Sequence, residues 1–171
     1  MIQRIRALSK RKDPQRTALD VNDVIQETLG LIEAELSRNH VSVSADLAPA
    51  LPTVFADRVQ LQQVILNLAM NGIESMLTAS ERPRELAVGS RLADDNRVAV
   101  TIRDNGTGFS SDETEQFFEP FFTTKPQGTG MGLSISRNIV EAHGGDIRAC
   151  ANADHGATFE FLLPLAAKAV A

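Results

Sequence analysis

The chain has 171 residues, 43% of them hydrophobic and 23% charged, which is ordinary for a globular protein with one buried core. No apolar stretch approaches the roughly 20 residues that span a bilayer, and the single cysteine, Cys150, excludes an internal disulfide. The net charge of −5 and the absence of Trp and Tyr disfavour a nucleic-acid surface, so we expect one cytoplasmic domain without nucleic-acid or membrane contact.

The first half of the chain predicts two long helices separated by a strand. Residues 1–12 are basic and weakly helical. Asp20 is expected to cap a helix over 20–36, whose apolar residues recur at helical spacing. Residues 41–45 alternate apolar and polar side chains, which is typical of a strand, and a second helix is expected over 57–76.

The second half predicts a β-hairpin over 86–102, because two alternating apolar segments flank an Asp-Asp-Asn turn. Residues 105–130 are rich in Gly and Pro and show no period, and a loop of that length is usually functional, often a lid. A helix is expected over 130–143, followed by strands near 146–152 and 157–163. Helices and hairpin strands in this order indicate a two-layer α/β sandwich.

The helix over 57–76 carries a polar stripe opposite its apolar side. The stripe consists of Gln60, Gln63, Asn67, Asn71 and Glu74. Amide oxygens are hard ligands that suit Mg²⁺, which takes few protein ligands alongside substrate phosphates. A solvated or capping stripe fits this helix alone equally well.

Asp104 follows a strand whose alternate residues face inward, so its carboxylate is expected to point toward the interior. A buried carboxylate needs a hydrogen-bond donor. Gly106 and Gly108 follow and would let the backbone approach the group that supplies this donor. The alternative is an ordinary turn Asp at a strand end.

The segment 128–133, Gly-Thr-Gly-Met-Gly-Leu, opens the expected third helix. Glycines at a helix start expose N–H groups and the positive end of the helix dipole, which together bind phosphate. The segment lacks the Gly-Lys-Ser/Thr ending of a P-loop and the spacing of the dinucleotide fingerprint. A flexible hinge is the alternative.

Taken together and in order, these motifs resemble those of sensor histidine kinases. The matching segments are the N box at Asn67–Asn71, the G1 box at Asp104–Gly108, the F box at Phe117–Phe122, the G2 box at Gly128–Leu133 and a last glycine box at Gly156–Phe159. The resemblance covers about residues 17–165. It implies the Bergerat-type fold of the GHKL superfamily, shared with gyrase, Hsp90 and MutL: a two-layer α/β sandwich whose mixed sheet is covered on one face by about three helices, with an ATP lid.

The resemblance implies that the domain binds ATP and Mg²⁺. Asn71 resembles the Mg²⁺ ligand, with Asn67 on the same helix face, and Asp104 resembles the acceptor of the adenine 6-amino group. Thr158 is similar to a residue that bonds this aspartate or an adenine-linked water. The implied glycine-box contacts are Gly106 and Gly108 at the adenine end and Gly128, Thr129, Gly130, Met131, Gly132 and Leu133 at the phosphate end.

The side chains of the lid receive separate expectations. Lys125 is a candidate phosphate contact, although a solvated lid lysine fits the sequence equally well. The four phenylalanines of the F box are expected to dock the lid and not to touch nucleotide. They are Phe117, Phe118, Phe121 and Phe122.

The function that the resemblance implies is transfer of the ATP γ-phosphoryl group to a histidine, with Asn67 and Asn71 in the catalytic site. No histidine here lies in an acidic helical context, so the acceptor is expected on a dimerisation domain missing from this chain, with a response regulator downstream. Residues 1–16 are expected to be the end of a dimerisation helix and a linker, and 17–171 the catalytic domain.

Two other functions stay open: a GHKL-type ATP hydrolase and a non-catalytic nucleotide-binding scaffold. The hydrolases and serine kinases of the superfamily resemble one another in placing Glu four residues before the Mg²⁺-binding Asn. That position is Asn67 here, and an amide is no general base at neutral pH. His143, at a helix end, and His155, in a turn, are expected to be non-catalytic, and Cys150 is expected to pack as a small hydrophobe.

Overall fold

The computed structural model describes residues 13–79, 81–123 and 130–167. The expected helical character of 1–12 falls outside these residues. Among the described helices, none is long and apolar enough to cross a membrane.

A five-stranded mixed sheet forms one layer of the molecule. Its strands, in spatial order, are β2 (Val41–Leu47), β4 (Arg84–Leu92), β5 (Arg97–Asp104), β7 (Ala157–Pro164) and β6 (Asp146–Ala151). β2 runs parallel to β4, and the other neighbours are antiparallel. The predicted hairpin is confirmed, with Val88 opposite Ile102 and Leu92 opposite Val98.

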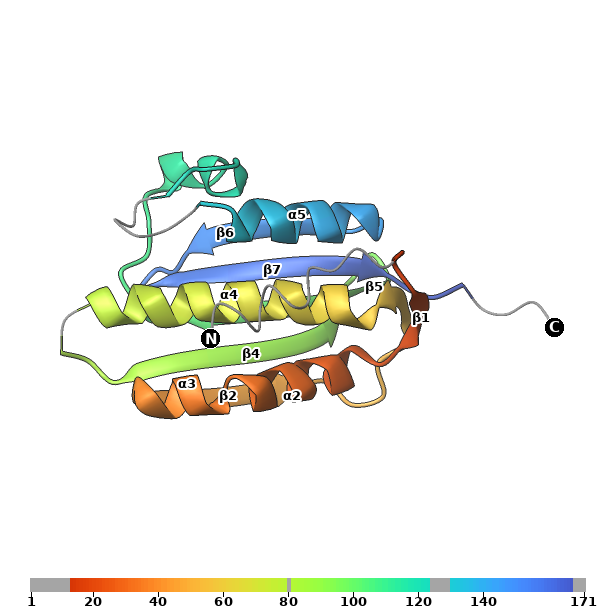
Figure 1. Cartoon of the computed structure of the whole chain (residues 1–171), viewed down its shortest axis with the longest axis horizontal. Helices are drawn as coiled ribbons and strands as arrows, with labels where there is room; N and C mark the ends of the chain where they lie inside the picture. The colour runs from red at the N-terminus through yellow and green to blue at the C-terminus, as the bar shows by residue number, and fades with distance from the viewer. Residues whose placement is uncertain (1–12, 80, 124–129, 168–171) are drawn as a thin grey trace.

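The helices cover one face of this sheet, as Figure 1 shows. They are α2 (Val21–Leu31), α3 (Glu33–Arg38), α4 (Arg58–Thr78) and α5 (Gly132–Ala142). The central helix α4 lies between α5 on one side and α2 with α3 on the other (Figure 1). The core fills the space between the helices and the sheet, and its fully buried members include Ile65, Leu68, Ile102 and Phe161. The predicted two-layer sandwich is confirmed.

The expected single helix over 20–36 is broken into α2 and α3. Asp20 caps α2 as predicted, because its Oδ1 accepts a hydrogen bond from the Asn22 N–H at 2.9 Å. The break lies at Ile32, which is not helical (φ −105°, ψ 6°). It closely follows Gly30, a poor helix former, and Ile32 and Leu36 on either side of the start of α3 are both buried.

A separate antiparallel ribbon was not predicted. It pairs β1 (Arg16–Leu19) with β3 (Val54–Asp57). Leu19, Val54 and Ala56 are buried, whereas Phe55 remains 55% exposed. β1 begins at Arg16, one residue before the expected start of the catalytic domain.

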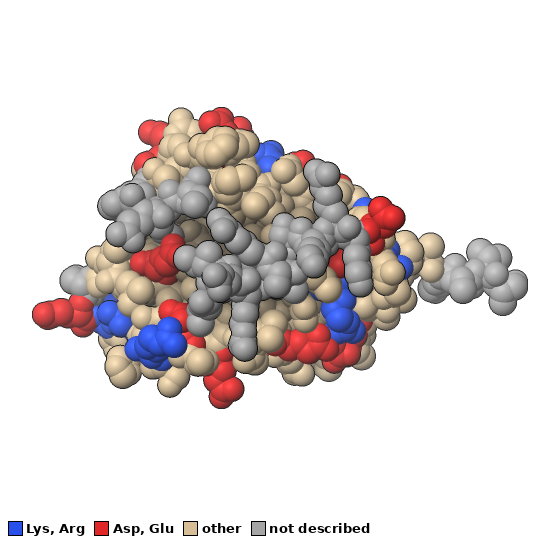
Figure 2. Space-filling model, in the orientation of Figure 1, with Lys and Arg blue, Asp and Glu red and all other residues tan. Residues whose placement is uncertain are grey.

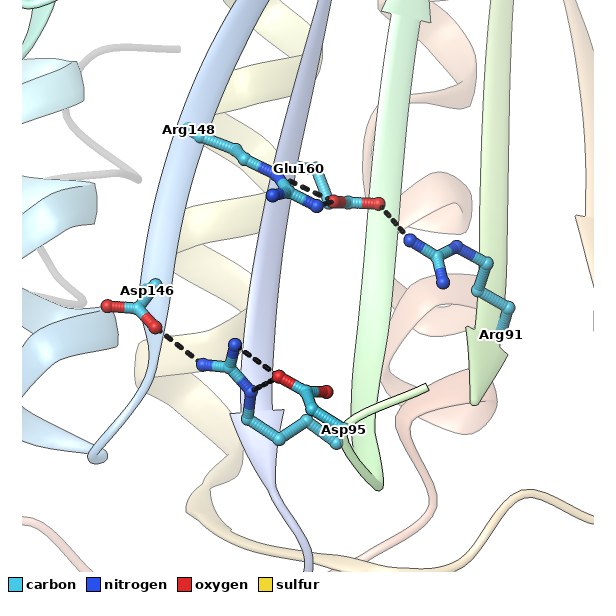
Figure 3. A network of polar contacts seen from close by, with 6 residues as sticks. Arg91, Asp95, Asp146, Arg148 and Glu160 are labelled. Atoms are coloured by element: carbon cyan, nitrogen blue, oxygen red, sulfur yellow. Dashed lines mark hydrogen bonds and ion pairs between the residues drawn. The ribbon is translucent and has the colours of Figure 1, made fainter. Parts of the chain in front are cut away.

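The face of the sheet opposite the helices carries a network of ion pairs (Figure 3). Glu160 on β7 accepts hydrogen bonds from Arg148 on β6 and from Arg91 on β4, the latter at 2.9 Å. Burial opposes ionisation of Glu160, but the two guanidinium groups outweigh it and hold its pKa below the usual value. On this face Ala99 and Leu162 are almost fully buried and pack together with Ala93.

Candidate nucleotide-binding site

Helix α4 presents the amide side chains predicted to face the ligand. Asp57 caps it, with Oδ1 accepting a hydrogen bond from the Gln60 N–H at 3.0 Å. Its apolar side is buried as predicted, while Asn67 and Asn71 are half-buried one turn apart on the polar side. The amphipathic pattern therefore places both amides at the edge of the core, within reach of solvent and of a ligand.

Asn67 joins α4 to the start of α5. Its Nδ2 donates to the carbonyl of Gly132 at 3.2 Å and to Ser136 Oγ at 3.3 Å. The sequence predicted that Asn67 and Gly132 belong to one site, and the structure brings them into direct contact. This contact leaves the amide oxygen of Asn67 as the group available to a ligand.

Asp104, at the end of β5, is only 2% exposed, as its parity along the strand predicted. Its Oδ1 accepts hydrogen bonds from the backbone N–H groups of Gly106, at 2.9 Å, and Ala157, at 3.4 Å. These hydrogen bonds offset the free-energy cost of burying a carboxylate. A Cβ added at Gly72 on α4 would lie 3.5 Å from Oδ2, the other oxygen, so the two carboxylate oxygens have different surroundings.

The glycines of the loop after β5 lie so close to neighbouring atoms that a side chain does not fit at these positions. A Cβ at Gly106 would lie 2.4 Å from Ser75 Oγ on α4. Gly108 and Gly156 have φ of +68° and +82°, and a Cβ at Gly156 would lie 2.1 Å from the carbonyl oxygen of Asp104. The glycines of the G1 box and of the last box therefore close one end of the site together.

Thr158 supports Asp104 indirectly. Its hydroxyl donates to Asn152 Oδ1 at 2.6 Å, and Asn152 Nδ2 donates to the backbone carbonyl of Asp104 at 3.0 Å. Of the two bonds expected for Thr158, the one to Asp104 is replaced by this bridge through Asn152, and the one to an adenine-linked water stays a prediction. The hydroxyl hydrogen of Thr158 is donated to Asn152 in this bridge.

The other end of the site is the N-terminus of α5. The helix begins at Gly132, two residues later than predicted, and no side chain caps its first turn among the described residues. Met131 is 41% exposed beside this turn, and Leu133 packs against the core. Gly130 has φ +67°, and its carbonyl accepts a hydrogen bond from the Phe121 N–H at 3.0 Å. Uncapped N–H groups and the helix dipole form an environment that favours phosphate.

The segment between the two ends contains structure that the sequence did not predict. Two short 3₁₀ helices, η1 (Ser111–Glu113) and η2 (Gln116–Phe118), lie in the expected loop. Lys125, Gly128 and Thr129 are outside the described residues, so their expected phosphate contacts remain predictions.

Three of the four F-box phenylalanines pack as predicted. Phe118 is buried, with its ring 6.3 Å from that of Phe159 in an edge-on arrangement. The ring of Phe117 packs against that of Phe109 at a tilt and against that of Phe122 edge-on. The prediction is wrong for Phe121, which is 74% exposed with φ +66°. The backbone at Phe121 turns to pair with Gly130, and this turn leaves the ring in solvent.

The remaining candidates have structural surroundings. His143 is buried; its Nδ1 donates to the Ile139 carbonyl at 2.7 Å and its Nε2 accepts from the Asp57 N–H at 3.1 Å. His155 is exposed in the β6–β7 turn, which agrees with a non-catalytic residue. The prediction for Cys150 is wrong, because its side chain lies on the open face of the sheet and is exposed.

Residues 56–167 match the family described as histidine kinase-, DNA gyrase B-, and HSP90-like ATPase. The chain belongs to this ATPase family. The matched region begins in β3 and runs past β7, so it includes Asn67, Asp104 and the start of α5. Nucleotide binding by this domain follows from membership of the family.

The similar members of this ATPase family are sensor kinases. Sensor protein TdiS of Thauera aromatica is 36% identical over 166 residues, and sensor protein FixL of Bradyrhizobium diazoefficiens is 42% identical over 166 residues. The alignments cover 96% and 97% of this chain but only 30% and 32% of the relatives. The chain therefore spans about a third of the length of these proteins.

Solved structures give the same result for the fold. The catalytic domain of histidine kinase ThkA, in a nucleotide-free form, is 33% identical with a TM-score of 0.76, and the match covers 88% of this chain and 96% of that domain. ThkA in complex with the response regulator protein TrrA is 28% identical with a TM-score of 0.77, covering 96% of this chain and 46% of that one. The expected histidine-kinase type of ATP-binding domain is confirmed.

Several residues that shape the site of this ATPase domain were missed from the sequence. They are Gly72, Ser75, Ser136 and Asn152. Gly72 carried a usable signal, because a glycine inside a helix costs stability unless packing requires it. The other three act through contacts with residues far away in the chain, as when the Thr107 N–H donates to Ser75 Oγ at 3.2 Å.

Proposed function

We propose that this domain binds ATP with Mg²⁺ and transfers the γ-phosphoryl group to a histidine of a separate dimerisation domain. The observation that carries the proposal is the side chain at position 67. A water-activating base would be expected there in a hydrolase, and the residue is Asn67, whose amide is bonded to Gly132 and Ser136. An amide does not take up a proton at neutral pH, whereas a neutral histidine ring nitrogen can attack phosphorus without such a base.

One end of the site binds the adenine base, and the other end binds the phosphates. Asp104 accepts the adenine 6-amino group through its carboxylate, with Gly106 and Gly108 shaping that end. The N–H groups at the start of α5 bind phosphate oxygens, because the helix dipole there favours negative charge. Thr129, Gly130 and Lys125 are proposed as further contacts on the triphosphate.

The donor set also fits a magnesium ion bound together with the triphosphate. Asn71 would supply an amide oxygen, with Asn67 beside it, and Mg²⁺ takes few protein ligands when phosphate oxygens and waters complete its octahedron. The ion would neutralise charge on the phosphates. The protein's part is to hold the γ-phosphoryl group in line with the incoming histidine, and positioning supplies much of the catalysis in phosphoryl transfer.

The partners follow from this chemistry. We propose that residues 1–16 connect the domain to a dimerisation helix that carries the acceptor histidine, and that a response regulator receives the phosphoryl group afterwards. The ThkA complex with TrrA supports a regulator as the downstream partner in this family. Cytoplasmic ATP would be the donor.

The test uses radiolabelled ATP with this chain alone and then with a separately produced acceptor domain of the same kinase. The chain alone is expected to bind ATP but neither to label itself nor to release phosphate appreciably, since general-base assistance worth about 10²–10⁴-fold is missing. Adding the acceptor domain is expected to give acid-labile label on that domain. The transfer is expected to be weak, because the covalent tether that raises the effective concentration is absent.

Other outcomes would contradict the proposal in distinct ways. Rapid phosphate release by the chain alone would indicate an ATP hydrolase. Acid-stable label on Ser or Thr would indicate a serine kinase. Binding of ATP without transfer to any acceptor helix would indicate a nucleotide-binding scaffold.

A further inference from the structure

Ser136 lies where α4 and α5 meet, and its side chain is completely buried. Its hydroxyl donates to the carbonyl of Gly132, one turn earlier in α5, at 2.9 Å. The same hydroxyl oxygen accepts a hydrogen bond from Asn67 Nδ2 at 3.3 Å, and the Gly132 carbonyl accepts from the same amide nitrogen at 3.2 Å. Three polar groups from two helices thus form one closed set of hydrogen bonds.

The donors and acceptors in this set allow only one orientation of the Asn67 carboxamide. A carbonyl can only accept, and the single hydroxyl hydrogen of Ser136 is used on Gly132. Ser136 therefore offers a lone pair to Asn67, and both contacts require the NH₂ group of Asn67 on this side. If the amide were turned over, its oxygen would face the Gly132 carbonyl, acceptor against acceptor.

We propose that Ser136 is a positioning residue that fixes the Asn67 amide with its oxygen directed away from α5, toward the metal-bound triphosphate. The inference rests on the proposed function, because it gives the amide oxygen a ligand. The same hydrogen bonds tie the first turn of α5 to α4.

Thr28 in α2 provides a control outside the site. Its side chain is completely buried, and its hydroxyl donates to the Val24 carbonyl, one turn earlier in the same helix, at 2.7 Å. This hydrogen bond is of the same kind as the one from Ser136 to Gly132. Thr28→Val keeps the shape of the side chain and removes a buried helix hydroxyl without releasing Asn67.

The experiment is calorimetric titration of the full chain with Mg·ATP and with ATP in EDTA. Ser136→Ala is expected to weaken Mg·ATP binding by roughly 3- to 10-fold, the value of one lost hydrogen bond, and to leave Mg-free ATP binding within about twofold. Thr28→Val is expected to match the wild type in both titrations. Ser136→Thr, which keeps the hydroxyl, is expected to bind Mg·ATP more tightly than Ser136→Ala.

A double-mutant cycle distinguishes positioning from a general structural effect. In an Asn67→Ala background, Ser136→Ala is expected to cause no further loss of Mg·ATP affinity, whereas fully additive losses would overturn the inference. Equal Mg·ATP affinity of wild type and Ser136→Ala would also overturn it. If Ser136→Ala does not fold, Ser136→Cys fills nearly the same space with a weaker hydrogen-bonding group and is expected to show a smaller loss of the same kind. Failure of the wild type to bind ATP at all would contradict the proposed function itself.

Discussion

At the scale of single residues, the two oxygens of Asp104 have different surroundings. Oδ1 accepts two backbone N–H groups, so an asparagine at this position would have to place its amide oxygen there. Its NH₂ group would then take the place of Oδ2 and face the adenine 6-amino group, donor against donor. We expect Asp104→Asn to weaken ATP binding by about 10- to 100-fold, the range for a lost hydrogen bond to a charged group.

The same reasoning predicts the response to GTP. The wild type is expected to reject GTP, because the guanine 6-oxo group would face a carboxylate and leave both acceptors unpaired. Asp104→Asn is expected to reduce the difference between the dissociation constants for ATP and GTP. Dissociation constants for ATP and GTP check this, with Asp94→Asn in the exposed β4–β5 turn as control. Comparable constants for the two nucleotides in the wild type would contradict the adenine assignment.

Residue roles were predictable where a local pattern determined them. The parity of β5 located the Asp104 carboxylate in the interior, and helical spacing placed Asn67 and Asn71 on one face. The bonds from Asn67 to Gly132 and Ser136 join residues 65 and 69 positions apart, so no local pattern contains them. The exposure of Cys150 was missed because edge strand β6 has one face open to solvent.

At the scale of elements, substitutions at two glycines test whether the backbone at each position requires glycine. Gly30 lies inside α2 with no atom within 4 Å of an added Cβ, whereas Gly156 has φ +82° and no room for one. Gly30→Ala is expected to raise the free energy of unfolding by about 0.5–1 kcal/mol through helix propensity. Gly156→Ala is expected to lower it by more than about 1 kcal/mol and to weaken ATP binding, since the displaced atom is the Asp104 carbonyl. Urea denaturation measures the free energy of unfolding of both variants. Equal effects of the two substitutions would contradict the inference that the backbone requires glycine at 156 and not at 30.

Long elements were predicted well and short ones were missed. The pattern of α4 extends over 21 residues, and the β4–β5 hairpin has a clear turn. Strands β1 and β3 have four residues each and are separated by 34 residues of chain. Segments this short show no periodicity that the sequence alone could reveal. They form because Val54 and Ala56 can be buried against the helices, which is a tertiary effect.

At the scale of the whole molecule, ion pairs on the face of the sheet opposite the helices contribute to the stability of the fold. Because the pKa of Glu160 is lowered in the folded state, its ion pairs stabilise the fold above the unfolded value near 4.5, and this stabilisation is lost as pH falls through the lower folded value. Glu160→Gln is expected to reduce the free energy of unfolding by about 1–3 kcal/mol at pH 7. The difference from wild type is expected to shrink below pH 4.5. Denaturation at several pH values, with Asp94→Asn as control, measures it, and a difference independent of pH would exclude the ion pairs as its cause.

The face of the molecule in Figure 2 shows acidic and basic side chains interspersed over the described residues, without an extended basic patch. On this face, the distribution agrees with the net charge of −5.

Nucleotide binding is expected to stabilise the whole fold, because the site joins α4, the end of β5 and the start of α5. A ligand that binds only the folded state adds about 2.7 kcal/mol at a concentration 100 times its dissociation constant. For a domain of this size that corresponds to a rise in Tm of roughly 5–10 °C. Thermal unfolding with Mg·ATP, with ATP in EDTA and with Mg·GTP measures the effect. Mg·ATP is expected to give the largest rise, Mg·GTP little or none, and Asn71→Ala is expected to reduce the Mg·ATP shift to that seen in EDTA. An undiminished shift in Asn71→Ala would show that this amide does not bind the metal.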